Sequence, residues 1–149
     1  DLFIIDTGSV FDSYFCDFDR NFAFGHICDE AREAYEVVFK ATDAGFRASQ
    51  VGNTTSDVFH AMNDVLQKGG ALGNSVGRLG HGLGLQLTEW PSNTATDNTT
   101  LRPGVILTLE PGMAYLPGKE MVHEENIVIT ESGPEWLTKR ASEELPIIQ

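Results

Sequence analysis

The chain has 149 residues, of which 41% are hydrophobic and 21% charged, and its formal net charge at pH 7 is −12. This composition suits a single globular domain over residues 1–149, and the acidic balance argues against nucleic acid and anionic membranes as partners. The two cysteines form no CxxC motif, and no membrane-length apolar stretch or signal peptide stands out, so the sequence favours a cytoplasmic protein without disulfides.

The chain opens with two predicted strands. Residues 2–6 form an apolar run typical of a buried strand, residues 7–13 have turn composition, and the alternating aromatic residues of 14–24 predict a second strand. A domain seldom begins inside a strand, so we expect that a segment upstream of residue 1 is missing.

Two helices are expected next. Residues 29–46 and 54–70 carry apolar side chains at helical spacing. Asp29 is a candidate N-cap for the first helix, a Thr or Ser caps the second, and the Gly pair at 69–70 ends it.

The second half of the chain has the composition of strands and loops. Alternation or apolar runs predict strands at 83–89, 105–112 and 122–130, and residues 91–104 form a polar loop. Two strands and two helices followed by a strand-rich half favour an α+β architecture.

Acidic residues stand at the ends of several of these strands. They are Asp6, Asp17, Glu110 and Glu125, and a single histidine, His81, is framed by glycines. Each of these residues taken alone most often has a structural role, but a buried group of four carboxylates is costly unless cations neutralise it. Two divalent ions match four negative charges, and oxygen ligands with one imidazole suit manganese, iron, cobalt or zinc. We therefore expect the five side chains to face one two-metal site.

Four short segments carry a resemblance to the pita-bread metallopeptidases, the family of methionine aminopeptidase, aminopeptidase P and prolidase. The segments are IIDTG from residue 4 with YFCDFDRNF from 14, GHGLGL from 80, LTLEPGM from 107 and HEENIVIT from 123. The resemblance implies a pita-bread fold and two divalent metal ions held by Asp6, Asp17, His81, Glu110 and Glu125. It also implies that metal-activated hydroxide attacks an amide carbonyl while Glu110 moves a proton.

Three positions depart from that family pattern. Thr88 stands where a second, substrate-facing histidine is usual, and it offers only one neutral donor. His123 replaces an arginine that is frequent in Xaa-Pro enzymes, and it either supplies the missing imidazole or bonds to a neighbour. Asp19 adds an acid on the strand face of Asp17, at a position where a neutral residue is common. Glu110, Thr88 and His123 are thus the candidate catalytic residues.

The departures leave three functions open. The first is an aminopeptidase or Xaa-Pro dipeptidase, the second is a relative acting on a small non-peptide amide, and the third is an inactive fragment that keeps the fold. Because the family has a further segment before the first aspartate, the apolar start of this chain is expected to pair with an upstream polypeptide or a second copy, as in a dimer.

Overall fold

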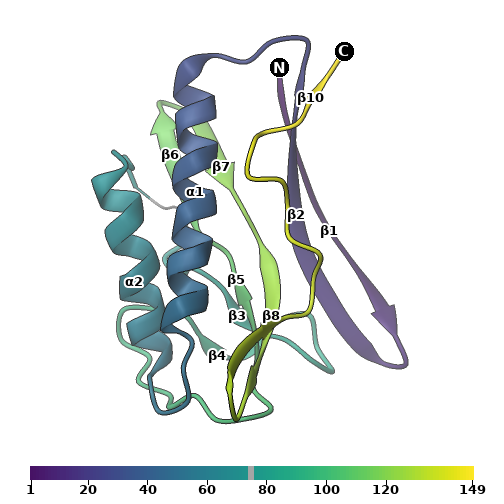
Figure 1. Cartoon of the computed structure of the whole chain (residues 1–149), viewed down its shortest axis with the longest axis vertical. Coiled ribbons are helices and arrows are strands. Elements are labelled where there is room, and N and C mark those ends of the chain that lie inside the picture. The colour runs from purple at the N-terminus through teal and green to yellow at the C-terminus, as the bar shows by residue number, and fades with distance from the viewer. Residues whose placement is uncertain (74–75) are drawn as a thin grey trace.

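Two helices cover one side of a five-stranded sheet in the computed structural model, which describes residues 1–73 and 76–149 (Figure 1). The helices are α1 (Asp29–Ala48) and α2 (Thr55–Lys68). The sheet has the strand order β4-β3-β5-β8-β9. Its strands are β3 (His81–Gly82), β4 (Glu89–Ser92), β5 (Ile106–Leu109), β8 (Glu125–Thr130) and β9 (Gly133–Trp136). The α+β class expected from the sequence is confirmed.

The two helices begin differently, because a side chain caps the first turn of α2 but not that of α1. Thr54 caps α2 in a capping box, in which its hydroxyl accepts from the Asp57 amide while the Asp57 carboxylate accepts from the Thr54 amide. The N-cap of α1 is Cys28, not Asp29 as predicted, and Asp29 contributes its charge to the first turn instead. Both ends of the predicted helices are otherwise within two residues of those observed.

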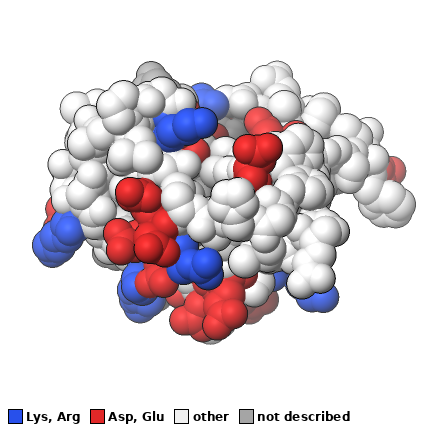
Figure 2. Space-filling model, turned by 90° about the horizontal axis from the view of Figure 1, so that it is seen from above, with Lys and Arg blue, Asp and Glu red and all other residues white. Residues whose placement is uncertain are grey.

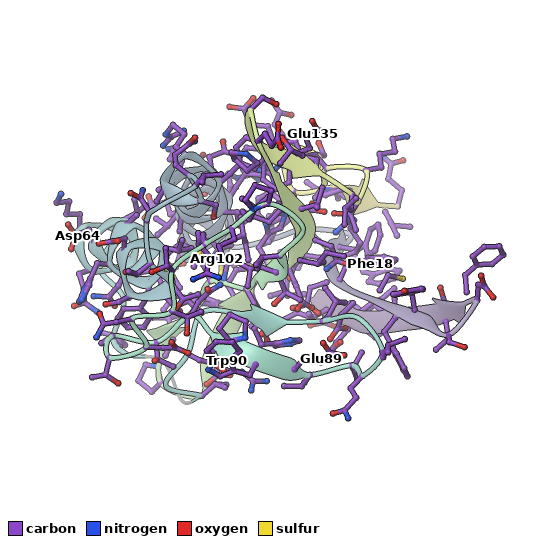
Figure 3. All side chains as sticks on the ribbon, turned by 90° about the horizontal axis from the view of Figure 1, so that it is seen from below. Phe18, Asp64, Glu89, Trp90, Arg102 and Glu135 are labelled. Carbon is purple, nitrogen blue, oxygen red and sulfur yellow. The ribbon has the colours of Figure 1, made fainter. Side chains whose placement is uncertain are left out.

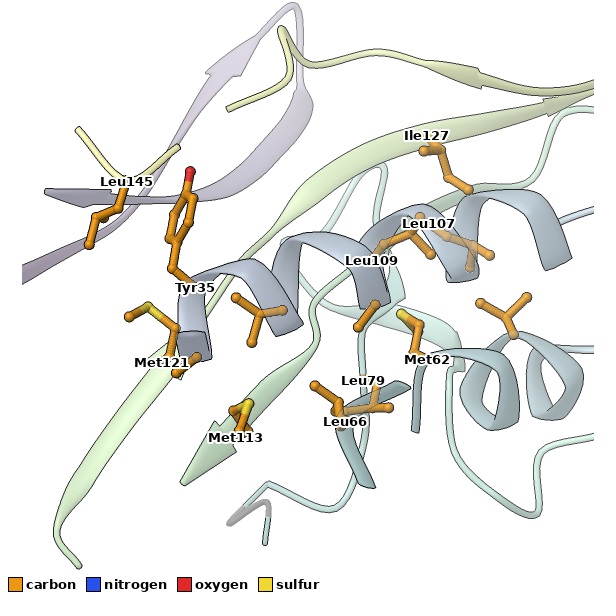
Figure 4. Close-up of a cluster of buried hydrophobic side chains, with 14 of the residues drawn as sticks. Tyr35, Met62, Leu66, Leu79, Leu107, Leu109, Met113, Met121, Ile127 and Leu145 are labelled. Atoms are coloured by element: carbon orange, nitrogen blue, oxygen red, sulfur yellow. The ribbon is translucent and has the colours of Figure 1, made fainter. Parts of the chain in front are cut away.

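The hydrophobic core lies between the helices and the sheet (Figure 4). Fully buried side chains from both layers meet there, among them Met62, Leu66, Leu79, Leu107, Leu109 and Ile127. Burial of each such side chain contributes roughly 1.5–3 kcal/mol, so this contact holds the sheet at a fixed distance from α1 and α2.

A long hairpin extends away from this body (Figure 1). It consists of β1 (Leu2–Phe11) and β2 (Tyr14–Phe24), and β10 (Ile147–Ile148) adds to β2 in parallel. The turn predicted at 7–13 is wrong, because the strand continues to Phe11 and only Asp12 and Ser13 turn, with φ of 48° and 73°. The hairpin leaves several large apolar side chains exposed, including Phe3, Val10, Phe11 and Tyr14.

The predicted strands of the second half are shorter than expected. Residues 83–88 form a loop and not a strand, and the strand predicted at 105–112 ends at Leu109. A hairpin of β6 (Gly112–Leu116) and β7 (Lys119–Val122) follows, which the sequence did not predict. The strand predicted at 122–130 is interrupted at positions 123–124, between β7 and β8.

The charge is unevenly distributed between surface and interior. On the face seen from above, Lys and Arg residues lie beside many of the Asp and Glu residues (Figure 2). Four acidic residues, in contrast, are buried: Asp17, Asp19, Glu124 and Glu125. No helix among the described residues is long and apolar enough to span a membrane. The buried acids are therefore the candidates for a functional site.

Candidate metal centre

His81 lies in the short central strand β3 with its ring buried. Its Nδ1 lies 2.9 Å from the carbonyl oxygen of Gly82, which can only accept, so Nδ1 carries the proton. Nε2 therefore presents a lone pair to the carboxylates around it. Burial lowers the pKa of His81, which keeps the ring neutral and able to ligate.

The glycines beside His81 allow β3 to approach its neighbours closely. A Cβ on Gly80, where φ is +122°, would lie 2.2 Å from the carbonyl oxygen of Thr108. A Cβ on Gly82 would lie 2.8 Å from the carbonyl oxygen of Trp90. Only glycine fits at both positions, so the framing glycines set the position of the imidazole between β4 and β5.

Three carboxylates surround the free ring nitrogen. His81 Nε2 lies 3.8 Å from Asp17 Oδ2, 3.9 Å from Glu124 Oε1 and 4.0 Å from Glu110 Oε2. These distances are too long for hydrogen bonds. Two atoms bound to one cation at about 2.0–2.2 Å can be at most about 4.4 Å apart, so the spacing fits atoms that share an ion.

A second group of ligand atoms adjoins the first. Oxygens of Asp6, Asp19 and Glu124 lie within 4.8 Å of one another, as do ligand atoms of Asp17, His81 and Glu124. Glu124 belongs to both groups. The arrangement offers two adjacent positions for cations, one with a nitrogen donor and one lined by carboxylate oxygens alone.

Several of these oxygens are buried without any hydrogen-bond donor among the described residues. They are Asp19 Oδ1, Glu110 Oε2 and Glu124 Oε1. An orphaned buried carboxylate oxygen costs about 1–3 kcal/mol or more, and a bound cation removes that cost. The side chains present thus fit divalent metal ions.

Glu125, predicted as a ligand, does not face this group. It follows Glu124 directly and is the first residue of β8, whereas Glu124 lies in the break between β7 and β8. Its carboxylate accepts hydrogen bonds from the Ala141 amide at 2.8 Å, from Arg20 Nη2 at 3.1 Å and from the Thr138 hydroxyl. The structure therefore does not bring Glu125 together with the other predicted ligands, and Glu124 lies where Glu125 was expected.

His123 also lies away from the cluster. Its ring packs against the aromatic rings of Tyr35 and Phe39 on α1, and Nδ1 is 2.8 Å from the hydroxyl of Thr42. Burial lowers the pKa of His123 to about 3. Of the two roles left open for this residue, the structure supports the bond to a neighbour and contradicts that of a substrate-facing imidazole.

Polar side chains join the strands that carry the acids. The amide of Asn126 on β8 bonds to both the N–H and the carbonyl of Asp17 on β2. Arg20 Nη1 donates to the carbonyl oxygens of Asp19 and Glu124, at 2.6 Å and 3.2 Å. Since β2 and β8 belong to different sheets, these bonds fix β2, which carries Asp17 and Asp19, relative to β8 and to Glu124 just before it.

Mutual repulsion and burial disturb the titration of the clustered acids. Burial, with the neighbouring acids second, raises the pKa of Glu124 to about 10 and that of Asp19 to about 7. The same causes raise the pKa values of Asp17 and Glu110, while Arg78 opposes the rise at both. Such shifts mark a site whose charges are not balanced by the protein alone.

A small cavity of about 30 Å³ adjoins Glu110. Arg78, Met113 and Val122 are among its lining residues, and Arg78 Nε is buried without a hydrogen-bond partner among the described residues. The volume is enough for one or two water molecules. Thr88, a candidate catalytic residue, is exposed and lies in the loop 83–88 between β3 and β4.

Three residues beside the cluster are not among the candidate ligands that the sequence predicts. Glu124 was passed over because it adjoins Glu125 and is identical to it in type, so only strand register separates them. Asp19 was noted as an additional acid without a role. Arg78 precedes the glycine-framed histidine by three residues, and that proximity was the one available signal.

Comparisons with known proteins identify relatives of this chain. The model of metallopeptidase family M24 matches residues 1–131. The curated Xaa-Pro dipeptidase of Pyrococcus furiosus is 34% identical over 144 residues, which cover 96% of this chain and 41% of that protein. The chain thus spans about two-fifths of the length of the curated relatives it matches.

Solved structures give the same result. A dipeptidase from Pyrococcus horikoshii matches 99% of this chain with a TM-score of 0.92 and 33% identity, over 41% of its own chain. An X-Pro aminopeptidase from Thermotoga maritima also matches 99% of this chain, with a TM-score of 0.88 and 28% identity, over 42% of its own. The fold of this chain therefore corresponds to a part of the pita-bread domain that such enzymes contain.

Proposed function

The chain belongs to metallopeptidase family M24, and we propose that it carries the two-metal centre of a hydrolase resembling Xaa-Pro dipeptidases. The observation that supports this most directly is the convergence of orphaned buried carboxylate oxygens on the free nitrogen of His81. The substrate class is a peptide or a small amide.

The ligand set we propose differs from the sequence-based one at a single position. It comprises Asp6, Asp17, His81, Glu110 and Glu124, with Glu124 in place of Glu125. Two divalent ions held by these residues, such as manganese, cobalt, zinc or iron, would polarise an amide carbonyl and lower the pKa of a bound water towards 7.

Glu110 is the residue placed to move a proton. Burial raises its pKa, so the carboxyl group takes up a proton more readily than a solvated one. The cavity beside it has room for the water it would deprotonate. Arg78 borders the same cavity and offers a cation to a negatively charged group of the substrate.

The absence of a second imidazole favours a restricted substrate range. Among the described residues, His81 alone of the four histidines faces the cluster. His26 and His60 are exposed, and His123 is buried against α1. Assistance from a positioned acid or base is worth about 10²–10⁴ in rate, so peptide hydrolysis is expected to be slow. This favours the small non-peptide amide as the second candidate.

The experiment that separates these functions is a substrate panel run on metal-loaded protein. Metal content is measured first, and two ions per chain are expected. Xaa-Pro dipeptides are then compared with small amides, and the Thr88→His variant is included. Hydrolysis of dipeptides that rises in this variant supports the peptidase. Turnover of small amides alone supports the second candidate, and two bound ions without turnover of either support the inactive fragment.

A further inference from the structure

Asp19 lies directly opposite Asp6 in the hairpin. The register of β1 and β2 pairs these two residues, and it pairs Asp17 with Gly8. Directly opposed residues point to the same face of the hairpin. Two aspartates in this position repel each other unless a cation or a proton lies between them.

Asp19 is buried although the described residues give one of its carboxylate oxygens no hydrogen-bond donor. The residue is 3% exposed, and Oδ1 has no hydrogen-bond donor among the described residues. The adjacent Arg20 donates to the backbone carbonyl of Asp19. Its Nη2 donates to Glu125 and to the carbonyl oxygen of Lys139. The carboxylate is thus aimed at Asp6 and Glu124, with which it forms one group of possible ligands.

We propose that Asp19 is an additional metal ligand, which completes an all-oxygen site with Asp6 and Glu124 and selects a hard, six-coordinate ion such as Mn²⁺ at that position. This inference rests on the two-metal centre proposed above. Octahedral oxygen sets suit manganese and magnesium, whereas zinc is commonly four-coordinate and accepts nitrogen. The neighbouring position, with His81, stays suited to zinc or cobalt.

Charge counting supports the same assignment. Asp6, Asp17, Asp19, Glu110 and Glu124 carry five negative charges, and two divalent ions supply four positive ones. The remaining negative charge faces Arg78, whose charge opposes the rise in pKa at Asp17 and Glu110. An extra carboxylate and a nearby arginine together keep the loaded site close to neutral.

The test is metal binding by the whole chain with Asp19→Asn, and Asp64→Asn is the matched control. Asp64 is an exposed residue on α2, at the opposite side of the molecule from Phe18, the neighbour of Asp19 (Figure 3). Protein freed of metal by chelation is titrated with Mn²⁺ and separately with Zn²⁺, and bound ions are counted. Loss of even an outer residue of a metal site costs about 10–100-fold in affinity. Asp19→Asn should therefore weaken Mn²⁺ binding at one of two sites at least tenfold and Zn²⁺ binding less, with no change in Asp64→Asn.

The outcomes are distinguishable. Wild-type protein that binds two ions while Asp19→Asn keeps its Mn²⁺ affinity, or gains affinity, overturns the role of Asp19 alone. Wild-type protein that binds no ion overturns the two-metal centre as well. If the asparagine variant does not fold, as judged by circular dichroism, Asp19→Ser leaves room for water and takes its place. Visible absorption of bound Co²⁺ is a further readout, since a six-coordinate ion in the wild type absorbs weakly and loss of a ligand strengthens the bands.

Discussion

Two neighbouring glutamates, identical in type and both buried, occupy opposite electrostatic environments. Glu124 is 2% exposed, faces other acids, and has a carboxylate oxygen without a donor. Glu125 is 0% exposed and accepts from two arginines, a hydroxyl and a backbone amide. Burial alone therefore does not distinguish a ligand from a structural carboxylate. The difference lies in whether the protein itself supplies the compensating charge.

Glu125 belongs to a network of ion pairs and ring contacts in which arginine side chains balance its charge. Arg140 binds Glu125 at 3.4 Å and Asp43 on α1 at 2.6 Å, and its guanidinium stacks over the rings of Phe39 and Trp136. These contacts tie the C-terminal segment and α1 to the back of β8. Among the described residues, no arginine side chain pairs with the carboxylate of Glu124, which is the expected state of a site that receives its positive charge from a bound ion.

The largest effect is expected on metal binding when Glu124 and Glu125 are replaced by glutamine in separate variants. Glu124→Gln should abolish binding of at least one of two Mn²⁺ or Zn²⁺ ions, because Glu124 belongs to both ligand groups. Glu125→Gln should still bind two. Direct counting of bound metal after gel filtration measures both variants. Metal loss in Glu125→Gln with full binding in Glu124→Gln would reverse the assignment of the two faces.

The free energy of unfolding should be lowered by Glu125→Gln and not by Glu124→Gln. Glu125→Gln leaves Arg20 and Arg140 without their shared carboxylate, and removal of one partner of a buried pair costs about 3–5 kcal/mol. Both arginine side chains keep about a fifth of their surface exposed, so we expect roughly 3 kcal/mol. Urea unfolding in the presence of chelator gives the value. Glu124→Gln should be neutral or stabilising in the same assay, because it removes a repelled charge.

These two glutamates also show how far the sequence was informative. Helix spacing and the second hairpin strand were readable, because the pattern of apolar residues determines them. The structure brings four of the five predicted ligands together, and their binding of metal stays a prediction. The choice between Glu124 and Glu125 was not readable, because it depends on the break between β7 and β8. The partners of Glu125 come from Arg20, Thr138 and Arg140, whose proximity only the folded chain creates.

The free energy of unfolding of the metal-free protein should depend on pH through Glu124. Burial and neighbouring acids raise the pKa of Glu124 to about 10, so the folded state keeps a proton that the unfolded state has lost above pH 4.5. Stability contributed by this group is therefore present at low pH and falls as pH rises, by up to roughly 1.4 kcal/mol per pH unit. Asp19 adds to the fall only up to its pKa of about 7.

Unfolding in chelator at pH 7, 8 and 9 isolates the contribution of Glu124. Glu124→Gln should have a flatter profile than the wild type, and saturating metal should flatten the wild type as well, because the ion takes the place of the proton. Parallel profiles for variant and wild type would show that Glu124 ionises freely and that its surroundings are better compensated than the contacts indicate.

The smallest effect on the free energy of unfolding at pH 7 is expected from replacing His123, which packs against α1. The Thr42 hydroxyl donates to the Val38 carbonyl at 2.9 Å, so Nδ1 of His123 must carry the proton that reaches Thr42. Nε2 is then an acceptor to which no described residue donates, and it lies 3.8 Å from Oε1 of Glu125, which is also an acceptor. Replacement of an unsatisfied buried ring by leucine should change stability at pH 7 by about 1 kcal/mol or less.

The sign of this effect should depend on pH. Burial lowers the pKa of His123 to about 3, so its contribution to stability is complete above pH 6.5 and is lost as pH falls towards 3. At pH 5, His123→Leu should therefore unfold with a free energy about 2 kcal/mol higher relative to wild type than it does at pH 7. Thermal unfolding at the two pH values measures the difference, and metal stoichiometry at pH 7 serves as the control. An unchanged stoichiometry fits a side chain that packs on α1. Metal loss in a folded variant would instead show that His123 contributes to the metal centre.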